Sequence, residues 1–468
     1  MEAEVFMAGA ARCEITPPLG SLINGDFITH YARQIHDPLY AKALVLKRGG
    51  VTVCFLVVDI CSMHNEFVSD VKAMIQARTA IPPDHILISC THTHGAGSIE
   101  SLLLTAADWP YRQRLPARLV QAVEDAVHRL SPAKIAFGSV DAPEHVVCRR
   151  YFMKPGYQAY NPVTDELDLV KTNPAGHGDQ IDRRESTIDP ELQYMAIKGT
   201  DDSWIGVLAN YSMHYVGDWE NGVITADYFG VFDRALAENL GAGADFVGMM
   251  SNGTSGDANI MDFMDPDRYP AGHFEKSTLI GRDLAGRVAH STGQLEWDGD
   301  PSLAVEYEEM LIRLRKPTEA ELVRAKDILS ATHYETLRLK ESHTGNEDGF
   351  RRIYAREQVL LSEFPDRVPI AVQLFRIGKA MIGALGGEIF SETGLWLKKH
   401  IRALSGNNHY FTVGLANGSM GYIPPAREFE LGGYETWRSR SSCMEEHAES
   451  ILREQLLELA RLASAENW

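Results

Sequence analysis

The sequence predicts an α/β fold with a mixed β-sheet core layered with helices, and its first third carries this prediction. Near-continuous apolar runs at Val51–Ile60 and His85–Cys90 are typical of buried strands. Phe67–Arg78 lies between them as an expected helix, and Pro116–Leu130 has apolar residues at helical spacing behind a proline. Ala133–Val140 then returns to a strand pattern. Such alternation of strands and helices is typical of layered α/β domains.

The middle of the chain is less regular. Glu144–Asp189 is rich in Asn, Pro, Gly and Asp with little periodicity, so we expect long loops there. Trp204–Leu208 and Phe246–Met250 are expected strands, and each leads into a polar segment. Because no repeat or low-complexity linker divides the sequence, we expect residues 1–468 to form a single catalytic domain.

The last third predicts two helices and a hairpin. These are a helix over Thr318–Leu339, a hairpin of Ile370–Ile377 and Ala380–Leu385, and an amphipathic helix over His447–Ala463. Thr318 and Glu321 have the spacing of a capping box, which marks a helix start. Gly378-Lys379 is the expected turn of the hairpin.

The composition excludes several classes of protein. The 45 Lys and Arg against 64 Asp and Glu give a net charge of −19, which repels nucleic acids and anionic lipid head groups. The six cysteines are scattered without a Cys-x-x-Cys pair, which excludes a disulfide scaffold and a cysteine-type zinc module. With no apolar run of about 18 residues and no signal-peptide pattern, we expect a cytoplasmic protein without a transmembrane segment. The oligomeric state is not predicted.

The strongest local signal is Thr91-His92-Thr93-His94-Gly95, directly after an expected strand. Residues i and i+2 of an extended segment face the same side, so His92 and His94 can converge on one ion or ligand. Neutral imidazole is a common metal ligand, and strand ends are where α/β folds build sites. Two histidines in an ordinary polar loop are the alternative.

Other candidate site residues also follow expected strands or glycines. They are His214, the loop residues Gly256, Asp257 and Asn259, Glu388 behind Gly386-Gly387, and the glycine-flanked Tyr422 and Tyr434. Imidazole, carboxylate and phenol groups can bind a metal or move protons, and a glycine-rich loop can turn backbone N–H groups toward a ligand. Each has an ordinary structural alternative: a buried histidine, a tight turn, a surface glutamate or a tyrosine that anchors a loop.

Taken in chain order, these segments resemble the neutral (alkaline, non-lysosomal) ceramidase family of zinc-dependent amide hydrolases. The matching pieces are Gly9-Ala10-x-x-x-Glu14-Ile15-Thr16-Pro17-Pro18, Val57-Val58-Asp59, Thr91–Gly95, His214, Gly256-Asp257, Gly387-Glu388, Gly414-Leu415-x-Asn417-x-x-x-Gly421-Tyr422 and Tyr434. They are spread over nearly the whole chain. The resemblance therefore implies a ceramidase-like catalytic domain.

The resemblance also implies roles for individual residues. His92, His214, Glu388 and Tyr422 match the family's zinc ligands, which implies one Zn²⁺ per chain. His94 and Tyr434 match residues beside the scissile amide, and Arg149, or less directly Arg150, matches a substrate-binding arginine. Two imidazoles, a carboxylate and a phenol leave zinc able to act as a Lewis acid on water.

The chain departs from the family in its glycine-rich loop. The family sequence Gly-Asp-x-Ser-Pro-Asn, aligned on Gly256-Asp257, places Asn259 at the serine, and Ser255 lies before the glycine. A serine nucleophile therefore does not transfer, and we expect attack by metal-bound water. The chain is also expected to lack the family's C-terminal β-sandwich and its export signal, which weakens ceramide as the substrate more than it weakens zinc hydrolysis.

The leading hypothesis is a zinc-dependent hydrolase of the C–N bond in a small-molecule or lipid-like N-acyl amide, with an ester bond left open. The first alternative is an amidohydrolase of the (β/α)₈-barrel type, which also begins with His-x-His but needs a lysine and two later histidines. The second alternative is a binding protein that keeps the ceramidase fold without activity.

Overall fold

Two β-sheets form the centre of the protein, whose computed structural model describes residues 5–330 and 347–465. The large sheet contains, in spatial order, β18 (Val247–Asn252), β16 (Trp204–Tyr211), β15 (Glu191–Gly199), β8 (Ser131–Asp141), β1 (Met7–Glu14), β5 (Tyr40–Arg48), β6 (Val51–Val58) and β7 (Ile86–Cys90). The small sheet contains β20 (Leu303–Arg313), β21 (Arg367–Ile377), β22 (Ala380–Leu385) and β24 (Tyr410–Val413).

Both sheets are mixed. Three neighbouring pairs are parallel, namely β6 with β7, β16 with β18 and β22 with β24, and the other pairs of the two sheets are antiparallel. A (β/α)₈ barrel needs eight parallel strands closed into a ring. The barrel alternative is therefore wrong, and the predicted mixed-sheet α/β class is confirmed.

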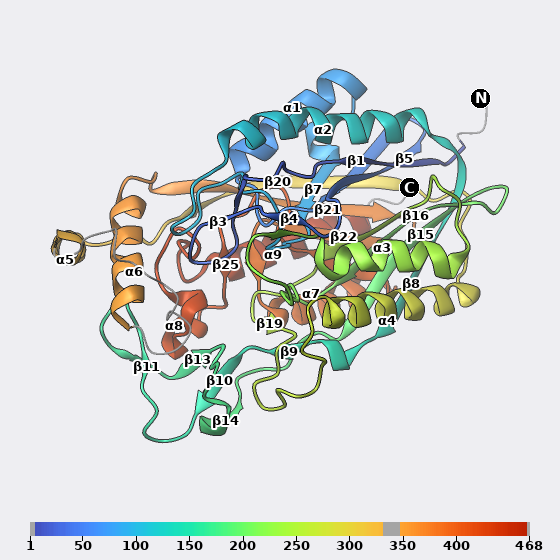
Figure 1. Ribbon diagram of the computed structural model, residues 1–468. Coiled ribbons are helices and arrows are strands. Elements are labelled where there is room, and N and C mark those ends of the chain that lie inside the picture. Colours follow the sequence, from blue (N-terminus) through green and yellow to red (C-terminus); the bar gives the residue numbers. More distant parts are fainter. Residues whose placement is uncertain (1–4, 331–346, 466–468) are drawn as a thin grey trace.

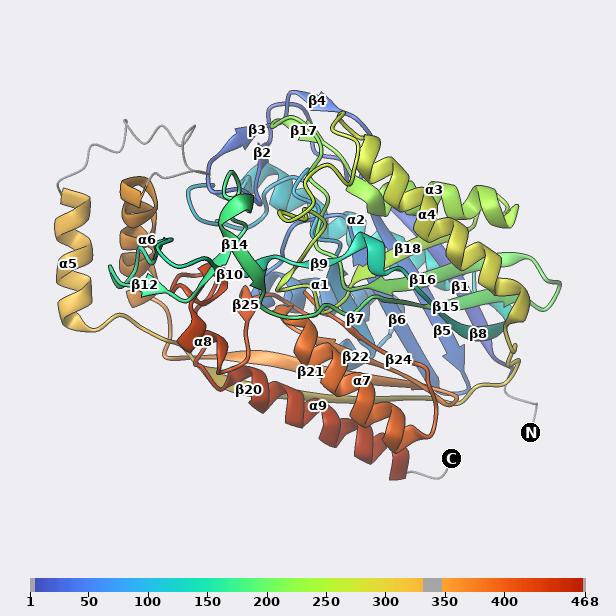
Figure 2. The same ribbon diagram turned by 90° about the horizontal axis from the view of Figure 1, so that it is seen from below.

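Helices cover the outer face of each sheet, giving four layers in the order helix, sheet, sheet, helix (Figures 1 and 2). The large sheet is covered by α1 (Asn65–Thr79), α2 (Trp109–His128), α3 (Asp227–Leu240) and α4 (Glu275–Ser291), and the small sheet by α7 (Ser391–Ser405) and α9 (Ala448–Ala465). Between the sheets lies an apolar core in which the rings of Phe55 and Phe375 are 4.8 Å apart. Such a core requires strands apolar on both faces, which explains the unbroken apolar runs.

Two further helices, α5 (Glu319–Ser330) and α6 (Glu347–Ser362), stand side by side at one end of the molecule (Figures 1 and 2). The capping box at the start of α5 is confirmed, because the Thr318 N–H donates to Glu321 Oε2 (2.7 Å) and the Glu321 N–H donates to Thr318 Oγ1 (3.3 Å). The predicted end of this helix, residues 331–339, lies outside the described residues.

Most expected strands and helices are confirmed, but two predictions are wrong. Helix α2 begins at Trp109 rather than Pro116, because Asp108 caps it by accepting from the Tyr111 N–H (3.1 Å), and Pro116 lies inside the helix. Glu144–Asp189 is not merely looped. It contains β9 (Val147–Cys148), β10 (Arg150–Met153), β11 (Ala159–Tyr160), β12 (Leu167–Asp168), β13 (Val170–Thr172) and β14 (Ile181–Arg184). These strands are too short for a periodic pattern.

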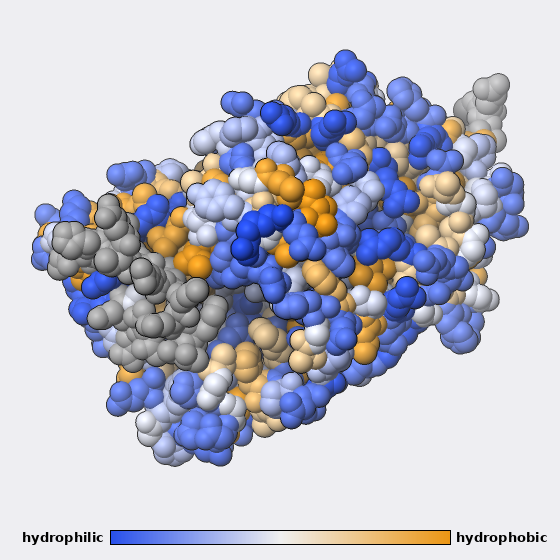
Figure 3. All heavy atoms as spheres, in the orientation of Figure 1, coloured by the Kyte–Doolittle hydropathy of each residue, from blue (hydrophilic) through white to orange (hydrophobic). Residues whose placement is uncertain are grey.

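The face in Figure 3 is mostly hydrophilic, with apolar side chains in scattered groups, as the net charge leads one to expect. Within the described residues, no helix is both long and apolar enough to cross a membrane. The assignment of residues 1–468 to one domain stays a prediction.

Candidate metal centre and active site

The candidate site lies where strands of the two sheets end together. His92 follows β7, His214 follows β16, and Glu388 begins β23 (Glu388–Ile389) just after β22. Asn252, at the end of β18, links these ends: its side-chain amide donates to the Thr91 carbonyl (3.2 Å), and its own carbonyl accepts from the Gly414 N–H (2.9 Å). The two sheets thus bring residues from distant parts of the sequence to one point.

Three side chains converge there. Nε2 of His92 lies 3.2 Å from Nε2 of His214 and 3.6 Å from Oε2 of Glu388, and the His214–Glu388 distance is 3.7 Å. Their exposed fractions are 5%, 3% and 7%. Ligand atoms at about 2.0–2.2 Å from a tetrahedral zinc ion are roughly 3.3–3.6 Å apart. The spacing of the three atoms therefore fits one bound cation.

A second observation supports this fit. Oε2 of Glu388 is buried and has no hydrogen-bond partner among the described residues, although buried polar atoms are nearly always paired. A carboxylate oxygen in such a position needs a cation to offset its desolvation. A metal ion bound to both imidazoles would supply that partner.

Backbone carbonyls orient both imidazoles. Nδ1 of His92 lies 2.7 Å from the Cys61 carbonyl, and Nδ1 of His214 lies 3.2 Å from the Ser255 carbonyl. A carbonyl can only accept, so each Nδ1 carries the proton and each Nε2 keeps its lone pair for a ligand. Burial, helped by the charge of Arg149, lowers the pKa of His214 well below its usual range, which favours the neutral form. His92 has φ +69°, a strained conformation of the kind that clusters at functional sites.

His94 and the two tyrosines border this group. Nε2 of His94 is 3.4 Å from Nε2 of His92. Tyr422 begins β25 (Tyr422–Ile423), whose parallel pairing with β23 places it beside Glu388. The hydroxyls of Tyr422 and Tyr434 are 2.5 Å apart, and burial raises the pKa of both phenols.

Of the two candidate arginines, only Arg149 faces the group. Its Nη1 lies 3.4 Å from Nε2 of His214, while its Nε donates to Glu435 (2.8 Å) and its Nη2 to the Gly256 carbonyl (2.7 Å). The Arg150 guanidinium turns the other way and donates to Glu435 (2.8 Å) and Glu428 (2.7 Å). The buried Glu435 thus fixes both guanidinium groups; its only signal in the sequence is its place beside Tyr434.

The side chains of the glycine-rich loop are engaged elsewhere. Asp257 accepts from the Ser391 N–H (2.8 Å) at the start of α7 and from the Ser186 hydroxyl (3.2 Å), and the Asn259 amide donates to Asn173 (2.9 Å). Gly256 packs against Glu388, because a Cβ built on it would lie 2.4 Å from the Glu388 carbonyl oxygen. The loop therefore shapes the site through its backbone, and direct substrate contact by Asp257 or Asn259 stays a prediction.

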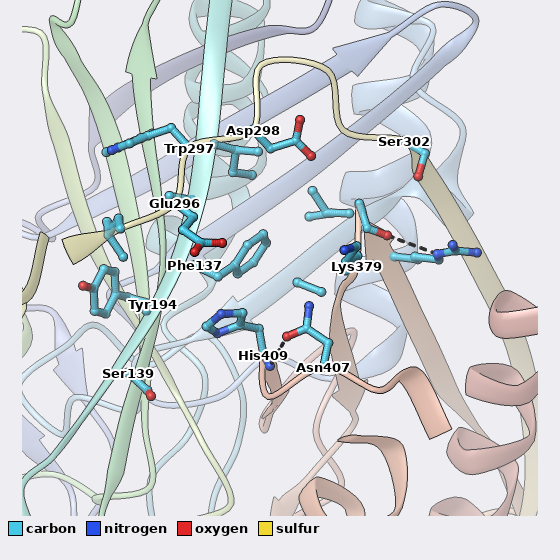
Figure 4. Close-up of a pocket in the computed structure, with 18 of the residues that line it drawn as sticks. Phe137, Ser139, Tyr194, Glu296, Trp297, Asp298, Ser302, Lys379, Asn407 and His409 are labelled. Atoms are coloured by element: carbon cyan, nitrogen blue, oxygen red, sulfur yellow. Dashed lines mark hydrogen bonds between the residues drawn. The ribbon is translucent and has the colours of Figure 1, made fainter. Parts of the chain in front are cut away.

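Two other places in the molecule have features of a binding site. Glu144, His145 and Asp283 lie close together, but Arg287 forms ion pairs with both carboxylates, and each ring nitrogen of His145 already has a hydrogen-bond partner. A cavity of about 1020 Å³ opens at the opposite ends of β22 and β24 (Figure 4). There His409 lies beside Phe137, with ring centroids 5.9 Å apart. Neither place combines buried ligand atoms with an unpaired carboxylate oxygen.

The fold is similar to that of solved ceramidase structures, although the sequence alone finds no match. No family model matches the sequence, and no curated protein matches it. Among solved structures, one described as "Ceramidase complexed with C2" matches with a TM-score of 0.70 and 15% identity, over 98% of this chain and 75% of that chain. The neutral ceramidase from Pseudomonas aeruginosa matches with a TM-score of 0.70 and 16% identity, over 99% and 75%. The protein therefore has a ceramidase-like fold.

Proposed function

We propose that this protein is a zinc-dependent hydrolase that cleaves the C–N amide bond of a small-molecule or lipid-like N-acyl amide. The observation that carries the proposal is the unpaired, buried Oε2 of Glu388 beside Nε2 of His92 and of His214. The ceramidase-like fold supports it, because solved structures of that fold carry the name of an amide hydrolase.

His92, His214 and Glu388 would hold the metal, with Tyr422 as the fourth protein ligand. Zinc bound by such a set supplies Lewis-acid polarisation of a carbonyl and lowers the pKa of water toward about 7. Histidine and carboxylate ligands also suit other first-row divalent metals, so the choice of zinc is part of the proposal.

The remaining side chains would move protons and hold charge. Nε2 of His94 faces the group at 3.4 Å, where it can take a proton from the attacking water and return it to the leaving amine. The Tyr434 hydroxyl would donate a hydrogen bond to the oxyanion that forms at the substrate carbonyl. Arg149, fixed by Glu435 and Gly256, would direct Nη1 at the same oxygen or at a neighbouring polar group of the substrate.

The test is metal content and hydrolysis measured on the same preparation. Protein purified without added metal is analysed for elements per chain, then assayed against N-acyl amides of short and long acyl chain and against matched esters. We expect about one zinc per chain and amide cleavage that a chelator abolishes and zinc restores. In the His92→Ala variant both should be lost. Metal-free, inactive wild-type protein would instead support the binding-protein alternative, and preferential ester cleavage would overturn the amide assignment.

A further inference from the structure

The imidazole of His94 is enclosed by two residues that belong to neither the metal group nor the proposed proton path. The Tyr215 ring stacks on it, with centroids 3.6 Å apart and planes inclined by 18°. The backbone of Gly25 lies against its Cβ–Cγ–Nδ1 side, because a Cβ built on Gly25 would be 2.5 Å from Cγ and 2.7 Å from Nδ1 of His94. A side chain larger than hydrogen at residue 25 would therefore occupy the space of the imidazole.

Hydrogen bonds anchor the residue adjacent to each of the two enclosing residues. Tyr215 precedes Val216, whose N–H donates to the buried carboxylate of Asp227 (2.8 Å). Gly25 follows Asn24, whose side-chain amide donates to the Glu100 carbonyl (3.2 Å). The backbone next to each enclosing residue is therefore anchored to another segment of the chain.

The enclosure limits rotation of the imidazole. Turning the ring about its Cβ–Cγ bond would drive it into Tyr215 or Gly25, since both already lie at contact distance. The two walls therefore fix the plane of the ring, and in this plane Nε2 lies 3.4 Å from Nε2 of His92.

We infer that Gly25 and Tyr215 form a clamp that positions His94, holding its ring in the plane in which Nε2 faces the group of His92, His214 and Glu388. This inference rests on the proposed function, in which Nε2 of His94 transfers protons. Proton transfer and attack require alignment within a fraction of an ångström, and a misplacement of about 1 Å can lower the rate about 100-fold. Gly25 and Tyr215 are positioning residues, because they act on the reaction only through His94.

Two pairs of variants test the clamp. In the first pair, Tyr215→Leu removes the aromatic face and Tyr215→Phe keeps it. In the second pair, Gly25→Ala places a methyl against His94, whereas Gly20→Ala is the matched control: Gly20 also has a positive φ (+89°, against +115° at Gly25), but a Cβ there would have nothing within 4 Å. The control therefore carries the backbone strain without the contact.

Each variant, loaded with zinc, is measured for kcat, KM, metal content and the NMR signals of ¹³C-labelled histidine rings. Stacking on Tyr215 shifts the His94 ring protons upfield through the ring current. We expect Tyr215→Leu and Gly25→Ala to lower kcat about 10- to 100-fold with metal content and KM little changed. Tyr215→Leu should also abolish the upfield shift, and Tyr215→Phe should restore both kcat and the shift.

Equal loss of kcat in Gly25→Ala and Gly20→Ala, or full kcat in Tyr215→Leu, would overturn the clamp. If Gly25→Ala fails to fold, the Tyr215 pair decides alone. Wild-type protein that binds zinc but cleaves no amide overturns the proposed function. In that case the ring signals alone decide whether Tyr215 holds His94: retention of the upfield shift in Tyr215→Leu would refute the stacking.

Discussion

Oε2 of Glu388 lies 3.6 Å from Nε2 of His92, although His92 follows a strand of the large sheet and Glu388 follows a strand of the small sheet. The carboxylate oxygen has no hydrogen-bond partner in the described part of the chain, and the imidazole presents its lone pair to it. Two such acceptors at this distance repel each other unless a cation lies between them.

Glu388→Gln should therefore lower the metal content at least tenfold while the protein stays folded, because the amide is isosteric but carries no charge. Elemental analysis and circular dichroism measure the two effects. Glu392→Gln is the matched control, since Glu392 lies nearby in the first turn of α7 and forms an ion pair with the exposed Arg427. Equal metal loss in both variants would remove Glu388 from the ligand set.

Tyr434→Phe should lower kcat by about 100- to 1000-fold and leave the metal bound, as expected for the loss of one oxyanion donor worth about 2.7–4 kcal/mol. The hydroxyls of Tyr434 and Tyr422 are 2.5 Å apart, so the variant also frees the Tyr422 hydroxyl. Steady-state kinetics report the role of Tyr434 as oxyanion donor, and metal analysis reports any effect of the variant on the proposed ligand Tyr422. Unchanged kcat would exclude Tyr434 as the donor.

Asp227→Asn should loosen the segment that follows His214. The two oxygens of the Asp227 carboxylate accept from the N–H groups of Val216 (2.8 Å) and Tyr228 (2.5 Å). In the asparagine variant an NH₂ group replaces one of these oxygens, and an NH₂ group cannot accept a hydrogen bond. We expect faster hydrogen exchange at the Val216 amide and a kcat lowered several-fold. Asp218→Asn is the control, because Asp218 accepts from the Ser277 N–H instead (2.9 Å). Unaltered exchange at Val216 would contradict the prediction.

Lys72→Met should stabilise the protein at neutral pH. Burial lowers the pKa of the Lys72 ammonium from 10.5 to about 7, although Asp84, Glu309 and Cys54 raise it. The buried ammonium therefore destabilises the folded protein. This destabilisation is absent above the unfolded-state pKa, grows as the pH falls from 10.5 to about 7, and is constant at lower pH. Each pKa unit corresponds to about 1.4 kcal/mol, so the gain should be on the order of a few kcal/mol.

Denaturant unfolding of both proteins at several pH values measures this gain. It should be largest at pH 7 and shrink toward pH 10, whereas the exposed Lys399→Met should show no such trend. A gain independent of pH would mean that packing of the methionine, and not removal of the charge, stabilises the variant.

The sequence predicted the layered fold because long buried strands leave unbroken apolar runs, as in Val51–Val58 and Ile86–Cys90. It also predicted the residues that meet at the candidate site, since His92 and His214 follow such strands. It could not predict the roles of Cys61, Tyr215 or Glu435. Cys61 contributes only its backbone carbonyl, and Tyr215 and Glu435 act through contacts with residues distant in the sequence, which no local pattern records.

The link that Asn252 makes between the ends of the strands has a consequence for how the site comes into being. His92 and Glu388 are 296 residues apart (388 − 92), and they follow strands of two different sheets, each of which needs its own strands before the two can dock. The binding centre can therefore exist only once nearly the entire chain has been synthesised and both halves have joined. Metal uptake would then serve as a late checkpoint of assembly, adding its binding energy only to molecules whose halves have met.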